Sequence, residues 1–451
     1  MNLIIENVGT VKNADIKLNG LTIIAGENDT GKSTVGRLLF SIVKAINRYE
    51  QDLKENKSQI ILRKIEKLYF KIRPIVSFSK HEKIQEIFNP RNFARQIEPF
   101  INAQTSLFSV DYSKEIEQIF QEKIDNLRKF DMESVHVIIK SLEDIKHTIL
   151  KEEKKEDVIK RALSKVFFSE FYSELSTKGC TYTSIIKCLE GENKIFDIEI
   201  NNNIITAFNL HDVLLFNDVT FIETPVILQM YDVIRSAGTL LEIEDKEQRM
   251  NAMERPKISL HIKDLVNKLE NAKYFADTFF ERGFSIIDTL KRISDIINGG
   301  FTFEKDNKDF LFSKLTSTKK NIKVRSVNTA SGIKSFGMIQ LLLQSNILDD
   351  RSLLIIDEPE NHLHPKWQVE YARLIVELVK NEINVLISSH SPYMIQAIKY
   401  FSDKYEIKEK VSFYLAEADE KESLSEINNV TDDLNKIFIK LAEPLQELVW
   451  K

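Results

Sequence analysis

Apolar and polar residues alternate at the start of the chain with the period of two that is typical of a half-buried strand. The alternation covers Met1–Glu6 and Ala14–Leu18, with Asn7–Val8–Gly9 between the two runs. Asn19–Gly20 then predicts a turn into a continuously apolar run that begins at Leu21. The pattern predicts a β-meander that leads into a buried core strand.

A helical pattern follows this strand. Apolar residues recur at helical spacing from Val35, which predicts a helix to about Tyr49. From about Gln51 to Lys178 only helical periods are found, and a helical insertion is predicted over residues 50–190. Two apolar stripes are expected to pack on each other, namely Ile116, Phe120, Ile124 and Leu127, and Val135, Ile138, Ile139, Leu142 and Ile145.

Strand signals return after the insertion. Ile195–Phe208 predicts a strand, an Asn-rich turn and a strand, and Val219–Ile222 predicts a buried strand, so core strands are expected over residues 191–255. A second helical lobe is predicted over residues 256–300. Phe301–Val327 is predicted to form the edge of a β-sheet.

The remaining core, residues 301–451, alternates strands with helices. Leu353–Glu358 and Val385–Ser389 are apolar and are predicted to be buried strands, separated by a helix over Pro365–Leu378. Beyond them the pattern predicts one strand and two short helices, over Val411–Leu415 and around Leu434–Val449. The chain is therefore predicted to be an α/β protein with an antiparallel β-lobe and large helical insertions.

Candidate chemistry begins where the third strand ends. The segment GENDTGKST contains G-x-x-x-x-G-K-[ST], the P-loop pattern, between a predicted strand and a predicted helix. Its glycines let backbone N–H groups surround phosphate oxygens, and the helix directs its positive N-terminus at the same anion. Lys32 is predicted to reach the β- and γ-phosphates of ATP, and Ser33 to bind Mg²⁺. The predicted ATP-binding residues of this loop are Gly26, Asn28, Gly31, Lys32, Ser33 and Thr34.

Two carboxylates end a later strand. LLIIDE finishes with Asp357 and Glu358, about 320 residues after the P-loop. Asp357 fits the Walker-B aspartate that holds Mg²⁺, and Glu358 fits the base that polarises the attacking water. His390 directly follows the next buried strand, where it could contact the γ-phosphate.

A Ser-Gly pair precedes these strands in NTASGIKS. Thr329 or Ser331 is expected to cap a helix that starts at Gly332. An anion at this N-terminus would meet free N–H groups and the positive end of the helix dipole. Such a pair alone is usually only a cap, but the neighbouring motifs favour a phosphate-binding role.

Composition limits the partners. The chain has 63 basic and 68 acidic residues, so no overall charge indicates nucleic acid or a membrane. A basic excess over about residues 51–100 leaves a DNA-binding face, a partner-protein surface and a solvated surface open. We expect a soluble, cytoplasmic protein, because no apolar run approaches the ~18 residues of a membrane helix and no signal peptide is evident. Cys180 and Cys188 are expected to be free thiols.

The segments GENDTGKST, TASGIKS, LLIIDEPENHLHP and ISSHSP resemble, in this order, the ABC-class ATPase head of SMC-like and OLD-family proteins. The resemblance covers about Met1–Tyr49 and Ile195–Tyr414. Within that class the chain resembles the stand-alone ATPase subunits of bacterial anti-phage systems such as PARIS and Septu. Its ASGIK signature, where transporter ATPases have LSGGQ, disfavours a transport role.

The resemblance implies a homodimer or higher homo-oligomer in which two ATP molecules lie between the heads. Ser331 and Gly332 would then bind the γ-phosphate of the opposite subunit's ATP. By the same resemblance Asn361–Pro365 form the crossing D-loop, and His390 is the switch histidine. ATP and Mg²⁺ are the implied cofactors.

Two elements of the family pattern differ. No Q-loop glutamine is evident, and Gln229 is the candidate for it. The Toprim nuclease domain of OLD proteins has no counterpart after His390, so the expected partner is a separately encoded effector, a nuclease or toxin. His362 and His364 lie inside the D-loop segment and are expected to serve that loop rather than a metal.

Three functions remain open, of which the third, a transporter nucleotide-binding subunit, is opposed by the long insertion and the unusual signature. The first is a regulatory ATPase that dimerises on ATP and controls an effector in phage defence. The second is an SMC-like DNA-repair or DNA-clamp ATPase that acts directly on DNA. An effector that co-purifies would favour the first, and DNA-stimulated, strongly salt-dependent hydrolysis the second.

Overall fold

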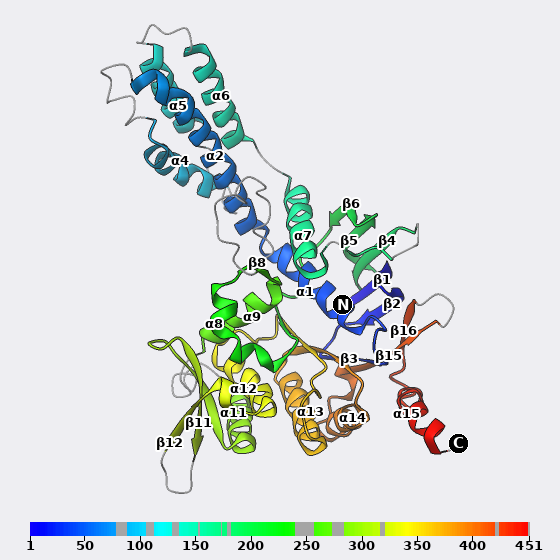
Figure 1. The fold of residues 1–451 in the computed structure, drawn as a ribbon. Helices are drawn as coiled ribbons and strands as arrows, with labels where there is room; N and C mark the ends of the chain where they lie inside the picture. The colour runs from blue at the N-terminus through cyan, green and yellow to red at the C-terminus, as the bar shows by residue number, and fades with distance from the viewer. Residues whose placement is uncertain are drawn as a thin grey trace. The chain divides into compact units, whose positions relative to one another are not determined.

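The computed structural model describes residues 1–77, 88–104, 112–128, 135–151, 154–172, 174–177, 182–239, 257–272, 284–315, 321–419 and 424–449. The chain divides into two compact units (Figure 1). The first combines Met1–Ile46 with Leu163–Lys451, and the second is Asn47–Ala162. Each unit has its own hydrophobic core.

One mixed sheet organises the first unit. Its strand order over the described residues is β6-β5-β4-β1-β2-β16-β15-β3-β14-β13-β7. The strands are β1 (Asn2–Val8), β2 (Val11–Lys17), β3 (Leu21–Gly26), β4 (Ser184–Glu190), β5 (Asn193–Asn201), β6 (Ile204–Leu210), β7 (Asp218–Ile222), β13 (Ser352–Asp357), β14 (Asn384–Ser389), β15 (Val411–Ala418) and β16 (Ser425–Asn429).

The sheet has a parallel half and an antiparallel half. Strands β15, β3, β14, β13 and β7 run parallel, whereas β2, β1, β4, β5 and β6 form an antiparallel lobe. Every residue of β3 is buried, as expected for a parallel strand covered on both faces, while β2 alternates buried and exposed residues. The predicted α/β fold with an antiparallel β-lobe is confirmed.

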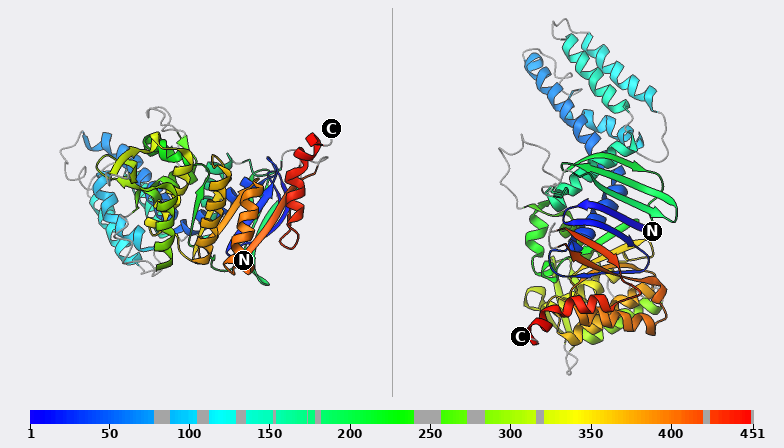
Figure 2. Two further views of the ribbon diagram at one scale, coloured as in Figure 1. Left: turned by 90° about the horizontal axis from the view of Figure 1, so that it is seen from below. Right: turned by 90° about the vertical axis from the view of Figure 1, so that its right-hand side faces the viewer.

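Helices cover both faces of the parallel half (Figures 1 and 2). Helices α12, α13 and α14 share a core with alternate residues of β3, β13 and β14. Helix α1 packs on the other face, where a Cβ added to Gly36 would lie 2.9 Å from Phe221 and 3.0 Å from Ile355. The main helices of this unit are α1 (Lys32–Asn47), α8 (Tyr231–Ser236), α9 (Leu260–Glu270), α11 (Phe284–Ile297), α12 (Ser331–Gln344), α13 (Pro365–Lys380), α14 (Pro392–Lys404) and α15 (Asn435–Val449), with 3-10 turns η1 (Pro225–Gln229), η4 (Ser326–Asn328) and η5 (Lys408–Lys410).

The strand register brings the ends of the parallel strands to one edge. Ala25 pairs with Ser389, Asp357 with Ser388, and Ile356 with Ile222. The residues that follow these strands therefore meet at the carboxyl edge of the sheet, the usual ligand-binding edge of an α/β fold.

The second unit is helical, and its two predicted stripes do share a core. That core contains Ile116, Phe120, Ile124 and Leu127 together with Ile138, Leu142, Ile145 and Ile149. Its helices are α2 (Tyr49–Ser77), α4 (Pro90–Gln104), α5 (Ser113–Arg128), α6 (Val135–Leu150) and the beginning of α7 (Lys155–Phe171). The predicted end at residue 190 is too late, because β4 pairs with β1 in the main sheet.

Two other predictions differ from the described structure. Residues 301–327 do not extend the main sheet, because β10 (Gly299–Glu304), β11 (Asp309–Leu315) and β12 (Asn321–Arg325) pair among themselves. A further strand pair, β8 (Gly238–Thr239) and β9 (Lys257–Ile258), is very short. Near the C-terminus the structure has the unpredicted β16 and one helix, α15, instead of two. Strand β16 has the sequence SEINN. It was not predicted because its single apolar residue gives no alternating pattern.

Two further expectations concern the cysteines and membrane-spanning segments. Cys188 is a buried free thiol, whereas Cys180 lies outside the described residues. None of the helices in the described part of the chain combines the length and hydropathy that a membrane span requires.

Candidate functional site

The P-loop connects β3 to α1 and depends on two glycines. Gly26 has a φ of 153°, and a Cβ there would lie 2.4 Å from the carbonyl oxygen of Ala416. Gly31 has a φ of 78°, and a Cβ there would lie 2.5 Å from Cγ2 of Val11. Side chains cannot occupy either position without displacing a neighbouring strand. The loop therefore requires both glycines for its own conformation.

Lys32 is buried inside this loop. Its ammonium donates to the carbonyl oxygen of Glu27 and lies 3.4 Å from Oγ1 of Thr30. Burial lowers the pKa of Lys32, although the charges of Glu358 and Asp357 oppose that shift. These contacts hold the amine inside the loop that precedes α1, which is compatible with the predicted contact to phosphate oxygens.

Ser33 and Asp357 are 324 residues apart in sequence and meet at the sheet edge. Ser33 Oγ donates to Asp357 Oδ1 at 3.0 Å, and Ser388 Oγ donates to the same oxygen. Burial raises the pKa of Asp357, while these two hydrogen bonds act against the shift. A hydroxyl and a carboxylate are hard oxygen donors of the kind that Mg²⁺ prefers, so this pair fits the predicted metal.

Glu358 has an unusual backbone conformation. Its φ is 47°, which is rare for a residue with a side chain and is often found at functional sites. Its N–H donates to the carbonyl oxygen of Ser388 at 3.2 Å. Its carboxylate accepts a hydrogen bond from Asn361 Nδ2 at 2.8 Å. Asn361, predicted as a D-loop residue, thus orients Glu358 of its own chain.

His390 lies between two carboxylates. Its Nδ1 is 3.3 Å from Glu360 Oε1 and 3.7 Å from Glu358 Oε1, and its side chain is 42% exposed. Glu360 is buried, which raises its pKa, and it accepts hydrogen bonds from the N–H of His390 at 2.6 Å and from Ser389 Oγ at 2.8 Å. Sequence reasoning missed Glu360, although its place two residues after Glu358 in DEPE could have indicated it.

The signature helix α12 begins differently from the prediction. It starts at Ser331 rather than Gly332, and its N-cap residue is Ala330, which provides no side-chain cap. Thr329 does not cap it, because its hydroxyl donates instead to the carbonyl oxygen of Arg325 at 3.1 Å. Among the described residues, therefore, no N-cap side chain accepts a hydrogen bond from the first turn of α12.

Gly332 has an internal packing role. A Cβ at this position would lie 2.9 Å from the ring of Trp367 and 3.2 Å from Leu363, so glycine lets α12 approach α13 closely. Ser331 is half-buried. Within the described residues no hydrogen bond joins Ser331 or Gly332 to the P-loop of the same chain.

The other predicted loop residues have local partners. His364 is the N-cap of α13, and its Nδ1 accepts from the N–H of Lys366 at 3.3 Å. His362 has a φ of 61° in the same loop. Across the described residues no cluster of three or more metal-ligating side chains occurs. Gln229 accepts a hydrogen bond from Lys334 of α12 at 2.5 Å.

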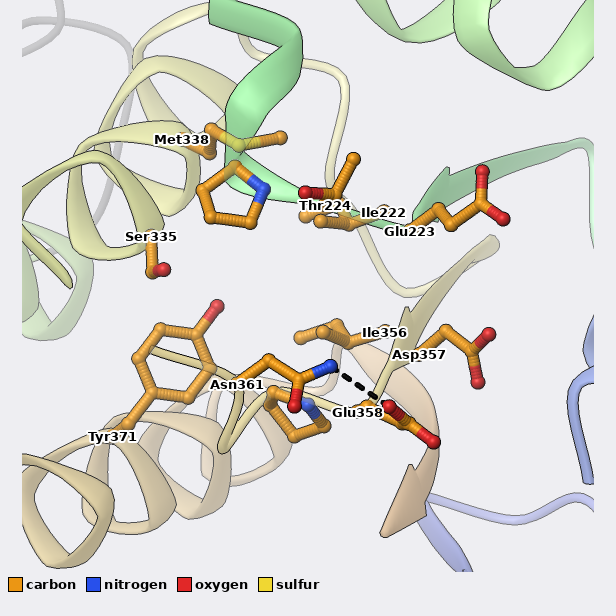
Figure 3. Close-up of a pocket in the computed structure, with 12 residues that line it drawn as sticks. Ile222, Glu223, Thr224, Ser335, Met338, Ile356, Asp357, Glu358, Asn361 and Tyr371 are labelled. Atoms are coloured by element: carbon orange, nitrogen blue, oxygen red, sulfur yellow. Dashed lines mark hydrogen bonds between the residues drawn. The ribbon is translucent and has the colours of Figure 1, made fainter. Parts of the chain in front are cut away.

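A small pocket opens at the sheet edge (Figure 3). The carboxylates of Glu223, Asp357 and Glu358 lie toward one end, whereas Ser335 and Tyr371 lie toward the other. Glu223 directly follows β7, which pairs with β13, the strand that ends in Asp357. Glu223 therefore lies at the end of this strand, whereas Gln229, the candidate Q-loop residue, lies further along the chain. Sequence reasoning missed Glu223, whose only signal was its position after a buried apolar run.

Curated and solved proteins show limited similarity. Septu protein PtuA from Bacillus thuringiensis is 37% identical over 51 residues, which are 11% of this chain and 13% of that protein. The SMC head domain from Thermotoga maritima is 10% identical with a TM-score of 0.36, over 95% of this chain and 98% of that one. An Smc head bound to the C-winged helix domain of ScpA is 8% identical with a TM-score of 0.38, over 96% and 98%.

A family model describes a much larger part of the chain. The model for the AAA ATPase domain (AAA_15) matches residues 1–395. This range includes the P-loop, Ser331, Asp357, Glu358 and His390, and it also includes the helical unit. The chain therefore belongs to this family of AAA ATPase domains.

Proposed function

We propose that this protein binds and hydrolyses ATP as a regulatory ATPase, that ATP drives two heads together, and that the dimer controls a separately encoded effector in anti-phage defence. The observation that carries the ATPase part is the meeting of Ser33 with Asp357 at 3.0 Å, with Glu358 next in the chain. Hydrolysis needs phosphate-binding groups, a metal site and a base close together. In this proposal the P-loop binds the phosphates, Ser33 and Asp357 form the metal site, and Glu358 is the base.

Each residue has a distinct task in this proposal. The P-loop N–H groups and Lys32 bind the β- and γ-phosphates, and Ser33 and Asp357 hold Mg²⁺, which supplies positive charge against the phosphates. Glu358 accepts a proton from the attacking water, with its carboxylate oriented by Asn361. His390, held by Glu360, faces the same reaction centre and would contact the γ-phosphate.

The first turn of α12 supports the dimer. In the described part of the chain its N-cap residue makes no side-chain cap, and neither Ser331, which is half-buried, nor Gly332 has a hydrogen bond to its own P-loop. A phosphate from a second copy of the chain would satisfy these groups, since helix N-termini favour anions. The site is then complete only when two chains meet.

The defence role rests on the short likeness to Septu protein PtuA, and the ASGIK signature disfavours a transport role. The test is to purify the protein with the product of the neighbouring gene, with and without ATP, and to measure complex mass and hydrolysis. We expect a stable complex whose mass or effector activity changes with ATP. Hydrolysis that requires DNA and falls steeply with salt, with no protein partner, would overturn the regulatory role.

Lys32→Ala is expected to weaken ATP binding by about 10²-fold or more, because the phosphates lose the buried cation of the loop. Calorimetric titration with ATP and Mg²⁺ measures the change. Lys399→Ala, which removes an exposed lysine on α14, is the matched control and should bind normally. Unchanged affinity in Lys32→Ala would contradict the assigned phosphate site.

A further inference from the structure

A buried histidine lies between two carboxylates close to the nucleotide site. His261 of α9 is 2% exposed, and its Nδ1 lies 2.5 Å from Glu170 Oε2. Its Nε2 lies 3.1 Å from Glu223 Oε2. The rings of Phe40 and Phe221 pack around the imidazole edge to face, with centroids 6.1 and 5.0 Å away. The imidazole can donate to both carboxylates at once only in its protonated form.

The surroundings favour this charged form. Burial alone would lower the pKa of His261, but the hydrogen bonds to Glu170 and Glu223 outweigh it and raise the pKa to about 9. The hydrogen bond from His261 in turn lowers the pKa of Glu223 to about 2. At neutral pH the cluster therefore holds the imidazolium of His261 beside the ionised carboxylate of Glu223.

A pH dependence of stability follows. The folded pKa of His261 lies above its ordinary value of 6.5, so its contribution is complete below about pH 6.5 and is lost as pH rises through about 9. Raising the pH from 7 to 9.5 is expected to lower the Tm of the native protein by about 2 °C more than that of His261→Gln. Scanning calorimetry at both pH values checks this, and equal shifts would contradict it.

Helix α7 ends in the same cluster. Ser169 Oγ accepts a hydrogen bond from the N–H of Leu260 at 2.8 Å, and Glu170 Oε1 accepts one from the N–H of His261 at 3.2 Å. Two side chains of α7 thus satisfy the first N–H groups of α9, whose own N-cap, Ser259, makes no side-chain cap. Helix α7 belongs to the helical unit up to Ala162 and to the ATPase unit beyond it.

Glu223 connects the cluster to the P-loop helix. Its Oε1 accepts from Arg37 of α1 at 2.5 Å, and Arg37 lies one helical turn after Ser33. Glu223 also lines the pocket beside Asp357 (Figure 3). Contacts therefore run without a break from α7 through His261 and Glu223 to α1.

A second ion-pair cluster fixes the other end of β7. Lys44 Nζ of α1 lies 2.5 Å from Asp218 and 2.8 Å from Asp264, while Lys268 Nζ lies 2.6 and 3.1 Å from the same two carboxylates. Helices α1 and α9 are therefore joined to both ends of β7. In the described part of the chain, the contacts of Ser169 and Glu170 connect α7 to the group formed by α1, β7 and α9.

We propose that Glu223 is a positioning residue of the ATP site, and that the chain of contacts Arg37–Glu223–His261–Glu170, of which His261 and Glu170 are buried, couples this site to helix α7 and hence to the helical unit. The proposal rests on the ATPase function proposed above. When α7 shifts, the hydrogen bonds of Glu170 move His261, and His261 moves Glu223. Because Glu223 pairs with Arg37, the position of the P-loop helix α1 changes as well. Conversely, nucleotide binding at the P-loop changes how firmly the end of α7 is held.

Hydrogen exchange provides a direct test, with the ATP analogue AMP-PNP and Mg²⁺ as the probe. We expect the analogue to change exchange in residues 163–171 of the native protein and to leave them nearly unchanged in His261→Gln. Glu170→Gln, which keeps a hydrogen bond but removes a charge, is the second variant if His261→Gln does not fold. Glu223→Gln is expected to reduce kcat about tenfold with little change in KM.

The control is His211→Gln, because His211 also pairs with a carboxylate, Asp197 at 2.9 Å, but does so in the antiparallel lobe. It should retain both the exchange response and kcat. If the native protein binds the analogue and shows no response in residues 163–171, or if His261→Gln and Glu170→Gln keep the full response, the coupling is wrong. If the native protein binds no nucleotide, the proposed ATPase function fails first.

Discussion

Glu358→Gln is expected to slow ATP hydrolysis by a factor on the order of 10² to 10⁴ while ATP still binds. Glutamine has the same size and still offers an oxygen to Asn361, but it cannot accept a proton from water. Because the P-loop, Ser33 and Asp357 are untouched, affinity for ATP should remain. The variant should also accumulate as an ATP-bound dimer, since hydrolysis no longer separates the heads.

Single-turnover hydrolysis and mass measurement with ATP and Mg²⁺ test both parts of this expectation. Glu409→Gln, an exposed glutamate, is the matched control and should hydrolyse ATP at the native rate. Native turnover in Glu358→Gln would place the base on another residue.

Ser331→Glu is expected to abolish ATP-driven dimerisation and hydrolysis, while the monomer still binds ATP. A carboxylate at the start of α12 suits the helix dipole, so the helix should persist, but it would repel the phosphate of a second subunit. Ser331 is a better target than Gly332 because a side chain at Gly332 would collide with Trp367 of the same chain. Loss of activity in a Gly332 variant would therefore not distinguish misfolding from a damaged dimer site.

A mixing experiment sharpens this test. Lys32→Ala and Ser331→Glu, each inactive alone, can form a mixed dimer that retains one intact P-loop opposite one intact signature. We expect partial recovery of hydrolysis when the two proteins are combined and their subunits exchange. Ile322→Glu adds the same charge at an exposed position on β12 and should stay fully active. Native turnover by Ser331→Glu alone would show that one chain makes a complete site.

The motifs and apolar runs predicted much of the ATPase unit because their signals are local. A P-loop needs glycines at fixed spacing before a helix, and a buried parallel strand is continuously apolar, so β3, β13 and β14 could be read directly. The stripes of α5 and α6 likewise predicted their shared core. Two features had signals too weak to predict. Strand β16 contains a single apolar residue, and the N-cap of α12 could not be predicted because the hydroxyl of Thr329 donates to the carbonyl oxygen of Arg325.

By itself, the sequence determined the P-loop, the two carboxylates at the end of β13 and the α/β class, since each depends on residue types at short spacing. Only the tertiary structure decided which distant residues join them. Glu223, His261 and Glu170 belong to three separate segments without a shared motif, and they meet because β7 pairs beside β13 and α7 caps α9. Burial of His261 and Glu170 then requires these charged groups to pair, because an unpaired charge in the interior is too costly.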